Sequence, residues 1–522
     1  MPLELPKIAD EIGVVISGAT ASIAPIVLRR DKEIDVHEED IVLIADSRID
    51  GYYMLGTVRW ITRFEPFLKR SVHNVYVEHP DALDSDLIMP FSNAYVEIYA
   101  GLCDGGVVCR GSQRSVSNVY PPTPGSRVYL IRDANPITSY LTVNAPIHVG
   151  THKYSKWRVP LDSAWINYHV GVFGATGMGK SRLVLKLVQE LSAKGFGLIV
   201  FDHSGVDYVP FAKALGAKLV DAGRIRISPD IFSAVVSRFV DVSGQQRDVI
   251  EVAAMCFAIS KYGGIESGVG GSGPSADECR EFLKTGGHRT VTLRDFAKHD
   301  EKISDFGELV EAIESVGKKL NLREATIVKL KLLTKLKVPP ELVNSLKERN
   351  VEPQDIVADA VSGGVVIVDM SSERDVEVKR GIVASIAQAA WSFTTSTDKL
   401  NLGLVVDEAQ NYACEYCGES GRALETIARE GRKWGYFVIV ASQRVTRDIR
   451  PGVRSNLGTV FFSKLQATGD LQELSGYLDM GRVTEASLSM LSRKEFYVAG
   501  LMNPLRRPIL LTVDDVSNVT TT

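Results

Sequence analysis

The stretch "GVFGATGMGKS", residues 171–181, carries glycines, a lysine and a serine at the spacing of a phosphate-binding loop. It fits the pattern G-x-x-x-x-G-K-[ST] without a mismatch. Glycines let the backbone wrap around phosphates, so that successive N–H groups and the next helix N-terminus face the anion. We expect Lys180 to bridge the β- and γ-phosphates of ATP and the Ser181 hydroxyl to be a Mg²⁺ ligand. The alternative is a chance match in a glycine turn. The predicted nucleotide-binding residues are Gly174, Gly177, Met178, Gly179, Lys180, Ser181 and Arg182.

Two adjacent acids follow a second apolar run, "LGLVVDEAQ". Asp407 comes at the end of this expected strand, where a parallel sheet places residues that face a ligand. An acid there can hold Mg²⁺ through its water shell, and Glu408 can polarise the attacking water as a general base. The alternative is a pair of surface acids that cap the next helix. Glu408 therefore indicates nucleotide turnover rather than a pure switch.

Two further polar residues are candidates for the same chemistry. Gln443 ends the apolar run "YFVIVASQ" and could sense the γ-phosphate, although a plain strand-terminating residue is an alternative. Arg432, in "ETIAREGRKWG", is the candidate arginine finger that a neighbouring subunit supplies to the transferring phosphoryl group. Its alternative is a solvated basic helix end, which the helix dipole favours.

Three other clusters invite a functional interpretation. In "FDHSGVDY", His203 has too few companions for a zinc site, and we expect it to fix the loop by a hydrogen bond. In "CEYC", no second cysteine or histidine pair completes a zinc site, so we expect Cys414 and Cys417 to be unpaired thiols. The basic stretch 318–337 could face DNA phosphates, but a charged face of a helical subdomain is the favoured interpretation.

The elements around these motifs alternate between strands and helices. A strand at "YHVGVFG", the loop, the helix "SRLVLKLVQELSAK" and the strand "GFGLIVFD" form a βαβ unit, which implies a parallel sheet. Further strands are expected at 363–370, 402–409, 436–443 and 458–464. Between about 231 and 350 the strand signals give way to amphipathic helices such as "DFGELVEAIESVGKKL". The glycine-rich run 263–275 within this region is expected to be a mobile loop.

The first 145 residues lack helical periodicity. Short runs rich in Val, Ile and Tyr, separated by Gly, Asp and Pro, predict a small antiparallel barrel or sandwich. These runs are "IGVVISG", "DIVLIAD", "YYMLGTVRWITRF", "NVYVEH", "AYVEIYAG" and "RVYLI".

Composition limits the possible partners. The chain has 522 residues, 45% hydrophobic and 24% charged, as in an ordinary globular protein of two to four domains. Its net charge of −4 gives no global electrostatic footprint for nucleic acid, so any DNA contact must be a local patch or a lined channel. Few cysteines, no signal peptide and no apolar run of about 18 residues predict a cytoplasmic protein in a reducing compartment.

Taken together, four stretches resemble the HerA family, archaeal hexameric DNA translocases of the HerA/FtsK branch of RecA-like ATPases. They are "HVGVFGATGMGKS", "FDHSGVDY", "VVDEAQNY" and "AREGRKWG…ASQR". The resemblance implies an α/β fold: a RecA-like P-loop core with an N-terminal small β-barrel (HAS-barrel-like) and an inserted helical subdomain. The implied domains are a β-barrel at 1–145, the core in two parts at 146–230 and 351–504, the helical subdomain at 231–350 and a C-terminal arm at 505–522.

The resemblance also implies a function. It suggests a homo-hexamer that hydrolyses ATP with Mg²⁺, moves double-stranded DNA through a central channel and acts with a NurA-type nuclease in DNA end resection. Glu408, Arg432 and Gln443 take the catalytic roles, and Asp407 and Ser181 the metal. One departure is Tyr168, where many relatives have an arginine. The alternatives are a conjugative or viral DNA-pumping ATPase and a nucleotide-gated scaffold.

Overall fold

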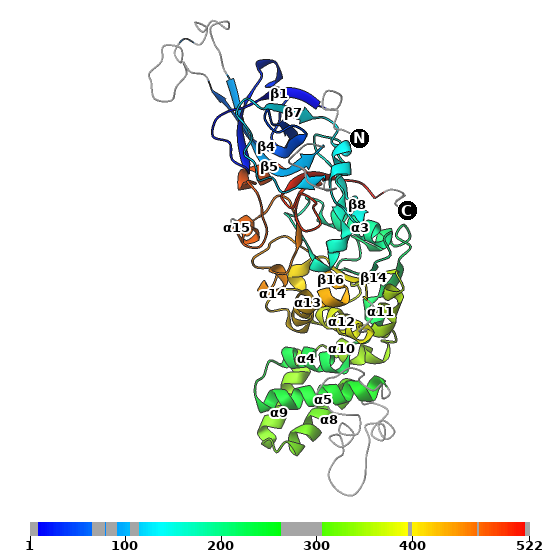
Figure 1. The fold of residues 1–522 in the computed structure, drawn as a ribbon. Helices are drawn as coiled ribbons and strands as arrows, with labels where there is room; N and C mark the ends of the chain where they lie inside the picture. The colour runs from blue at the N-terminus through cyan, green and yellow to red at the C-terminus, as the bar shows by residue number, and fades with distance from the viewer. Residues whose placement is uncertain are drawn as a thin grey trace. The chain divides into compact units, whose positions relative to one another are not determined.

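The computed structural model describes residues 9–64, 79, 91–104, 114–262, 305–394, 399–466 and 469–516 (Figure 1). The chain divides into two compact units. The first comprises Met1–Glu190, Gln443–Val445 and Leu457–Val516, and the second comprises Leu191–Ser442, Thr446–Asn456 and Ser517–Thr522.

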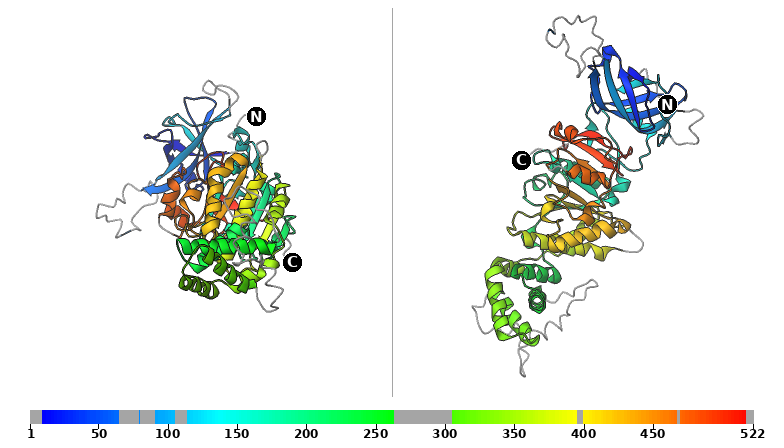
Figure 2. Two further views of the ribbon diagram at one scale, coloured as in Figure 1. Left: turned by 90° about the horizontal axis from the view of Figure 1, so that it is seen from below. Right: turned by 90° about the vertical axis from the view of Figure 1, so that its left-hand side faces the viewer.

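The N-terminal part of the first unit is a closed, six-stranded antiparallel barrel, visible in blue in the right-hand view of Figure 2. The strand order is β2-β1-β7-β3-β4-β5, and β5 pairs back with β2 to close the ring. The short β6 (Ser115–Val116) pairs with β5. The barrel strands are β1 (Ala9–Val15), β2 (Ile23–Leu28), β3 (Ile41–Ala45), β4 (Tyr52–Phe64), β5 (Phe91–Cys103) and β7 (Arg127–Ile131).

Because β2 pairs with β5 and closes the ring, the predicted barrel or sandwich is a barrel. The side chains of β2 alternate between the interior and the surface, with Ala24, Ile26 and Leu28 buried in the barrel core. Strands β1, β3, β4, β5 and β7 confirm five of the predicted runs, whereas β2 was not predicted. Pro25 lies in its middle, and a proline ordinarily argues against a paired strand because it lacks an N–H donor. Here its carbonyl accepts a hydrogen bond from the Ile16 N–H, 2.9 Å away.

A buried ion cluster joins the barrel to the C-terminal hairpin of the same unit. The Arg59 guanidinium lies 2.5 Å from Glu39 and 2.7 Å from Glu97, and all three side chains are at least nine-tenths buried. Arg59 Nη2 also donates to the Pro508 carbonyl at 3.1 Å, and the Tyr99 hydroxyl donates to the same oxygen at 3.0 Å. Each charge is therefore paired, which buried charges require.

The rest of the first unit carries the strand that leads into the phosphate loop. Strand β11 (Val170–Phe173) pairs in parallel with β17 (Thr459–Phe462), followed in antiparallel order by β18 (Glu495–Gly500), β19 (Ile509–Val513) and β9 (Gly150–His152). Helix α3 (Lys180–Ser192) follows the loop. Shorter elements are β8 (Pro146–Ile147), β10 (Leu161–Asp162), α15 (Asp470–Ser475) and α16 (Glu485–Ser489). Strand β19 lies within the segment 505–522 that was expected to be a C-terminal arm.

The second unit contains five parallel strands in the order β13-β14-β12-β15-β16. The side chains of β12, β15 and β16 form nearly continuous buried apolar runs, as expected of strands with both faces covered. Helix α11 packs on β12 and β14, α13 packs on β16, and α12 contacts both helices. The bounds are β12 (Gly197–Asp202), β13 (Lys218–Asp221), β14 (Val365–Asp369), β15 (Leu402–Val406), β16 (Tyr436–Ser442), α11 (Pro353–Val361), α12 (Val376–Ala389), α13 (Gly418–Glu430) and α14 (Pro451–Arg454).

A group of helices is inserted in the chain between β13 and β14 (Figure 1). It comprises α4 (Pro229–Val240), α5 (Gln245–Tyr262), α8 (Asp305–Lys319), α9 (Glu324–Lys337) and α10 (Pro340–Asn344). In α8, Leu309, Ile313 and Val316 are fully buried, which confirms the predicted apolar face. With the barrel and the α/β core, this insertion confirms the predicted fold class.

Two predictions lie outside the described residues: almost all of the run "NVYVEH" and the glycine-rich run 263–275. None of the helices in the described ranges combines the length and the apolar character that crossing a membrane requires.

Candidate functional site

The phosphate loop has the backbone geometry that its sequence predicts. Gly177 has φ +83° and Gly179 has φ +100°, values that side-chain-bearing residues rarely adopt. Lys180 is 8% exposed, and its ammonium donates to the Gly174 carbonyl at 2.9 Å and the Ala175 carbonyl at 3.4 Å. The lysine therefore lies folded over the loop, within reach of the groups that the loop N–H donors would bind.

Backbone hydrogen bonds from the same unit support the loop at both ends. The Ala175 N–H donates to the Lys464 carbonyl at 2.6 Å, and the Lys494 N–H donates to the Met178 carbonyl at 2.8 Å. Ser181 and Arg182 lie in the first turn of α3, and the Arg182 N–H donates to the Gly179 carbonyl at 3.1 Å. This arrangement can bind an anion such as a nucleotide phosphate.

In the second unit, Asp407 directly follows β15 and is 3% exposed. The Tyr208 hydroxyl donates to its Oδ2 at 2.7 Å, and the Glu408 N–H donates to its Oδ1 at 2.8 Å. Burial, and then the charge on Asp407, raise the pKa of Tyr208 well above its usual value, so the phenol remains a donor. The carboxylate is thus fixed in orientation by two donors.

The surroundings of Asp407 fit the predicted role toward Mg²⁺. The Tyr208 hydroxyl and the Glu408 N–H hold the Asp407 carboxylate in one orientation, and carboxylate oxygens are acceptors that can bind a metal ion or its bound water. Mg²⁺ is held in nucleotide sites by one or two carboxylates together with phosphates. Asp407 and the Ser181 hydroxyl carry the oxygen chemistry that such an ion prefers.

Glu408, the predicted base, is half-buried and adopts a left-handed backbone conformation with φ 48° and ψ 46°. Such a conformation costs a non-glycine residue about 1–3 kcal/mol and persists only where its surroundings hold it. Strain of this kind clusters at functional sites, which agrees with the role predicted for Glu408.

The loop "FDHSGVDY" is organised by hydrogen bonds. Asp202 accepts from the N–H groups of Gly205 at 2.9 Å and Tyr208 at 2.8 Å, so it fixes the loop. His203 Nδ1 lies 2.6 Å from the Tyr412 hydroxyl, which confirms the predicted hydrogen bond. Burial, and then the charge on Lys379, lower the pKa of His203, which is therefore neutral at pH 7.

The two remaining predicted residues lie at the ends of their elements. Arg432 is exposed, in the short helical turn Gly431–Trp434 after α13. Its neighbour Arg429 pairs with Glu425 at 2.7 Å within α13. Gln443 is half-buried and directly follows β16. Their roles toward a nucleotide stay predictions.

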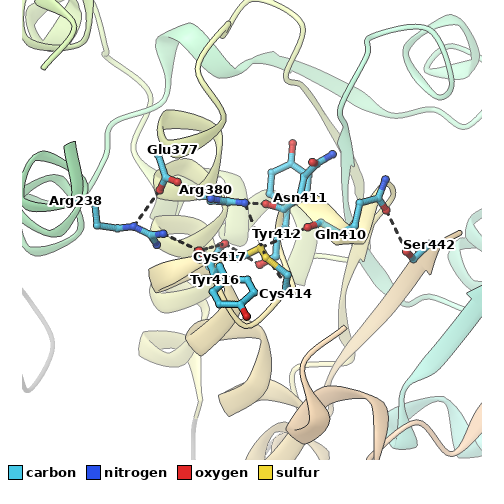
Figure 3. The surroundings of a disulfide bond; sticks show 11 residues. Arg238, Glu377, Arg380, Gln410, Asn411, Tyr412, Cys414, Tyr416, Cys417 and Ser442 are labelled. Atoms are coloured by element: carbon cyan, nitrogen blue, oxygen red, sulfur yellow. Dashed lines mark hydrogen bonds and ion pairs between the residues drawn. A yellow bond between two sulfur atoms is a disulfide. The ribbon is translucent and has the colours of Figure 1, made fainter. Parts of the chain in front are cut away.

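The prediction of two unpaired thiols is wrong, because Cys414 and Cys417 form a disulfide (Figure 3). The turn between them brings the two cysteines together, because the Cys417 N–H donates to the Cys414 carbonyl at 3.1 Å. Cys417 directly precedes α13. The Cα atoms are 5.1 Å apart, within the range that a disulfide spans. The spacing C-x-x-C was compatible with this pairing, but it does not distinguish a disulfide from two thiols.

Comparison with known proteins shows which family this chain resembles. Residues 147–390 match the family model described as "Helicase HerA, central domain". These residues are similar to the central domain of HerA. Two relatives named "DNA double-strand break repair helicase HerA" extend the similarity. The one from Sulfurisphaera tokodaii is 22% identical over 91% of this chain and 90% of its own length. The one from Saccharolobus solfataricus is 23% identical over 83% and 78%. The resemblance to HerA is confirmed.

Among solved structures, VirB4 of Thermoanaerobacter pseudethanolicus is similar with a TM-score of 0.49 and 17% identity, covering 72% of this chain and 98% of that chain. The bacterial conjugative coupling protein TrwB has a TM-score of 0.48 and 15% identity, covering 75% and 94%.

The HerA central domain contains the phosphate loop and Tyr208 but ends before Asp407. The contact between the Tyr208 hydroxyl and the Asp407 carboxylate was not predicted from the sequence. The position of Tyr208 at the end of the motif "FDHSGVDY" was a signal that this tyrosine is functional. Its partner could not be identified, because 199 positions separate Tyr208 from Asp407. Sequence reasoning also missed Ser442 and a side-chain contact of Gln410 that is described below.

Proposed function

We propose that this chain is an ATPase that moves along double-stranded DNA, as the name of its HerA relatives suggests. The observation that carries the proposal is the match of residues 147–390 to the HerA central domain, with a phosphate loop of the required backbone geometry inside it. The N–H groups of the loop and Lys180 bind the phosphates of ATP. Asp407 and Ser181 hold Mg²⁺, which neutralises charge on the phosphates.

Glu408 accepts a proton from the attacking water as general base. Arg432, exposed at the end of α13, reaches the nucleotide of a neighbouring copy and stabilises the charge that develops during transfer. Gln443 senses the γ-phosphate. This division of roles requires an oligomer, and we propose the homo-hexamer that the family resemblance implies. A NurA-type nuclease is the proposed partner in DNA end resection.

Binding to DNA must be local, because the chain carries a net charge of −4. Lys and Arg side chains that face phosphates give sequence-independent binding. The affinity of such binding falls steeply as the salt concentration rises, because the release of counterions from DNA then gains less free energy. We expect binding to linear duplexes of unrelated sequence to be similar, and to weaken together between 50 and 200 mM salt.

Steady-state ATP hydrolysis, measured with no nucleic acid, with a single strand and with a linear duplex, tests the proposal. Stimulation by the duplex and displacement of a third strand from it are expected of a motor. Turnover that ignores every nucleic acid favours a nucleotide-gated scaffold. Lys180→Ala should abolish turnover, and Lys194→Ala, an exposed lysine just beyond α3, is the matched control.

A further inference from the structure

The turn that begins at Glu408 sets the direction of its side chain. The Glu408 carbonyl accepts from the Asn411 N–H at 2.9 Å. The Ala409 carbonyl accepts from the N–H groups of Tyr412 at 3.0 Å and Ala413 at 2.7 Å. These bonds hold the left-handed conformation of Glu408, but they leave its side-chain torsions free.

The Gln410 side chain supplies the missing restraint. Its amide Nε2 donates to Glu408 Oε2. Its Oε1 lies 3.1 Å from the Ser442 hydroxyl (Figure 3). Ser442 is fully buried at the end of β16, and its hydroxyl also lies 2.6 Å from Asp448 Oδ2. The amide thus connects the Glu408 carboxylate to a buried strand end.

The chain on the other side of Gln410 is also held in place. Arg380 Nε donates to the Asn411 carbonyl at 2.6 Å, and the disulfide between Cys414 and Cys417 closes the following turn (Figure 3). The Ser420 hydroxyl donates to the Tyr412 carbonyl at 2.8 Å. Because its backbone is anchored, the Gln410 amide can restrain Glu408 rather than follow it.

We infer that Gln410 is a positioning residue for Glu408 in ATP hydrolysis, an inference that rests on the proposed ATPase function. Its amide fixes one carboxylate oxygen, and the other oxygen stays available to accept a proton from water. Glutamine suits this role because it donates a hydrogen bond without adding a charge that would compete for Mg²⁺ or phosphate. The restraint acts on the chemical step and not on nucleotide binding.

The test separates kcat from KM. Misplacing a reacting group by about 1 Å costs on the order of a hundredfold in rate, so we expect Gln410→Ala to lower kcat about ten- to a hundredfold. The KM and the Kd for ATP should stay within about twofold, because phosphate binding belongs to the loop. Gln388→Ala, an exposed glutamine on α12, is the matched control and should keep the wild-type kcat.

Two variants of similar size distinguish hydrogen bonding from packing. Gln410→Glu keeps the shape but replaces the donor with a like charge beside Glu408, so kcat should fall at least as far as in Gln410→Ala. Gln410→His keeps an N–H donor and should recover part of the activity. This pair decides the question even if Gln410→Ala is too unstable to assay, and thermal melts of each variant show which rates come from folded protein.

A Gln410→Ala enzyme with the kcat of the Gln388→Ala control overturns the inference, as does Gln410→Glu with wild-type turnover. In either case the ATPase proposal stands, because the wild-type chain is active. If the wild-type chain binds ATP but hydrolyses none, with or without duplex DNA, the proposed function itself fails.

Discussion

The buried histidine His152, at the end of β9, should make the free energy of unfolding of this protein fall in acid. It is 2% exposed, and its Nδ1 accepts from the Tyr154 N–H at 3.4 Å and lies 2.9 Å from the Ser155 hydroxyl. Because a backbone N–H can only donate, Nδ1 carries no proton in the folded state. Protonation at this nitrogen would break the hydrogen bond from the Tyr154 N–H and require the Ser155 hydroxyl to turn and accept.

Burial is the main cause that lowers the pKa of His152 to about 4; the backbone of Glu39 opposes it and the charge on Arg59 adds to it. The unfolded chain has a histidine pKa of about 6.5 and therefore binds more protons between pH 6.5 and 4. The free energy of unfolding is unaffected above pH 6.5 and falls as the pH drops toward 4. The difference of about 2.5 units corresponds to a loss of about 3 kcal/mol.

The measurement is urea unfolding at pH 7 and pH 4, followed by tryptophan fluorescence, since the backbone carbonyl of buried Trp157 accepts from the backbone N–H of His152 at 2.7 Å. His152→Asn keeps a side-chain acceptor for Ser155 but does not titrate. Other groups titrate equally in both proteins, so the wild type should lose about 3 kcal/mol more than the variant. An equal loss in wild type and His152→Asn would refute the reasoning.

Three further predictions concern the proposed subunit interface, the barrel and the disulfide. Arg432→Ala should be nearly inactive, and mixing it with Glu408→Gln should restore some ATP turnover at mixed interfaces; no recovery despite verified mixing contradicts the trans role. Arg59→Met should lower the free energy of unfolding by about 3–5 kcal/mol, because it removes the cation that pairs with buried Glu39 and leaves Glu97 with Arg507, 3.5 Å away; a chemical denaturation midpoint checks this. Replacing Cys414 and Cys417 by serine should lower it by about 2 kcal/mol, the chain entropy of so short a loop. A reductant should then lower the melting temperature of the wild type by more than that of the double variant, which keeps the disulfide-bonded Cys103 and Cys256.

Much of the α/β core could be predicted because each element has a local signal. The strands of the core are continuous apolar runs, and the helix after the loop begins directly at the lysine of the motif. The barrel strand β2 could not be predicted, because Pro25 conflicts with local strand rules and only pairing with β1 and β5 stabilises it. A local sequence pattern cannot show that a strand pairs with a partner as distant in the sequence as β5.

The same limit applies to the candidate site. The motifs identified Lys180 and Glu408 by residue type, because phosphate and proton chemistry require those groups. The donors that orient the carboxylates, Tyr208 and Gln410, depend on contacts that folding creates. The disulfide was missed for a different reason, since a C-x-x-C spacing permits either redox state.

Closure of the barrel by β2 and β5 restricts how another protein can dock there. A strand at an open sheet edge presents free N–H and C=O groups to which a second chain can add, but a ring of paired strands presents none along its paired length. A partner protein that docks on this barrel would therefore have to recognise outward side chains or the connecting loops. Its specificity would reside in residues that can be exchanged one at a time without disturbing the barrel that carries them.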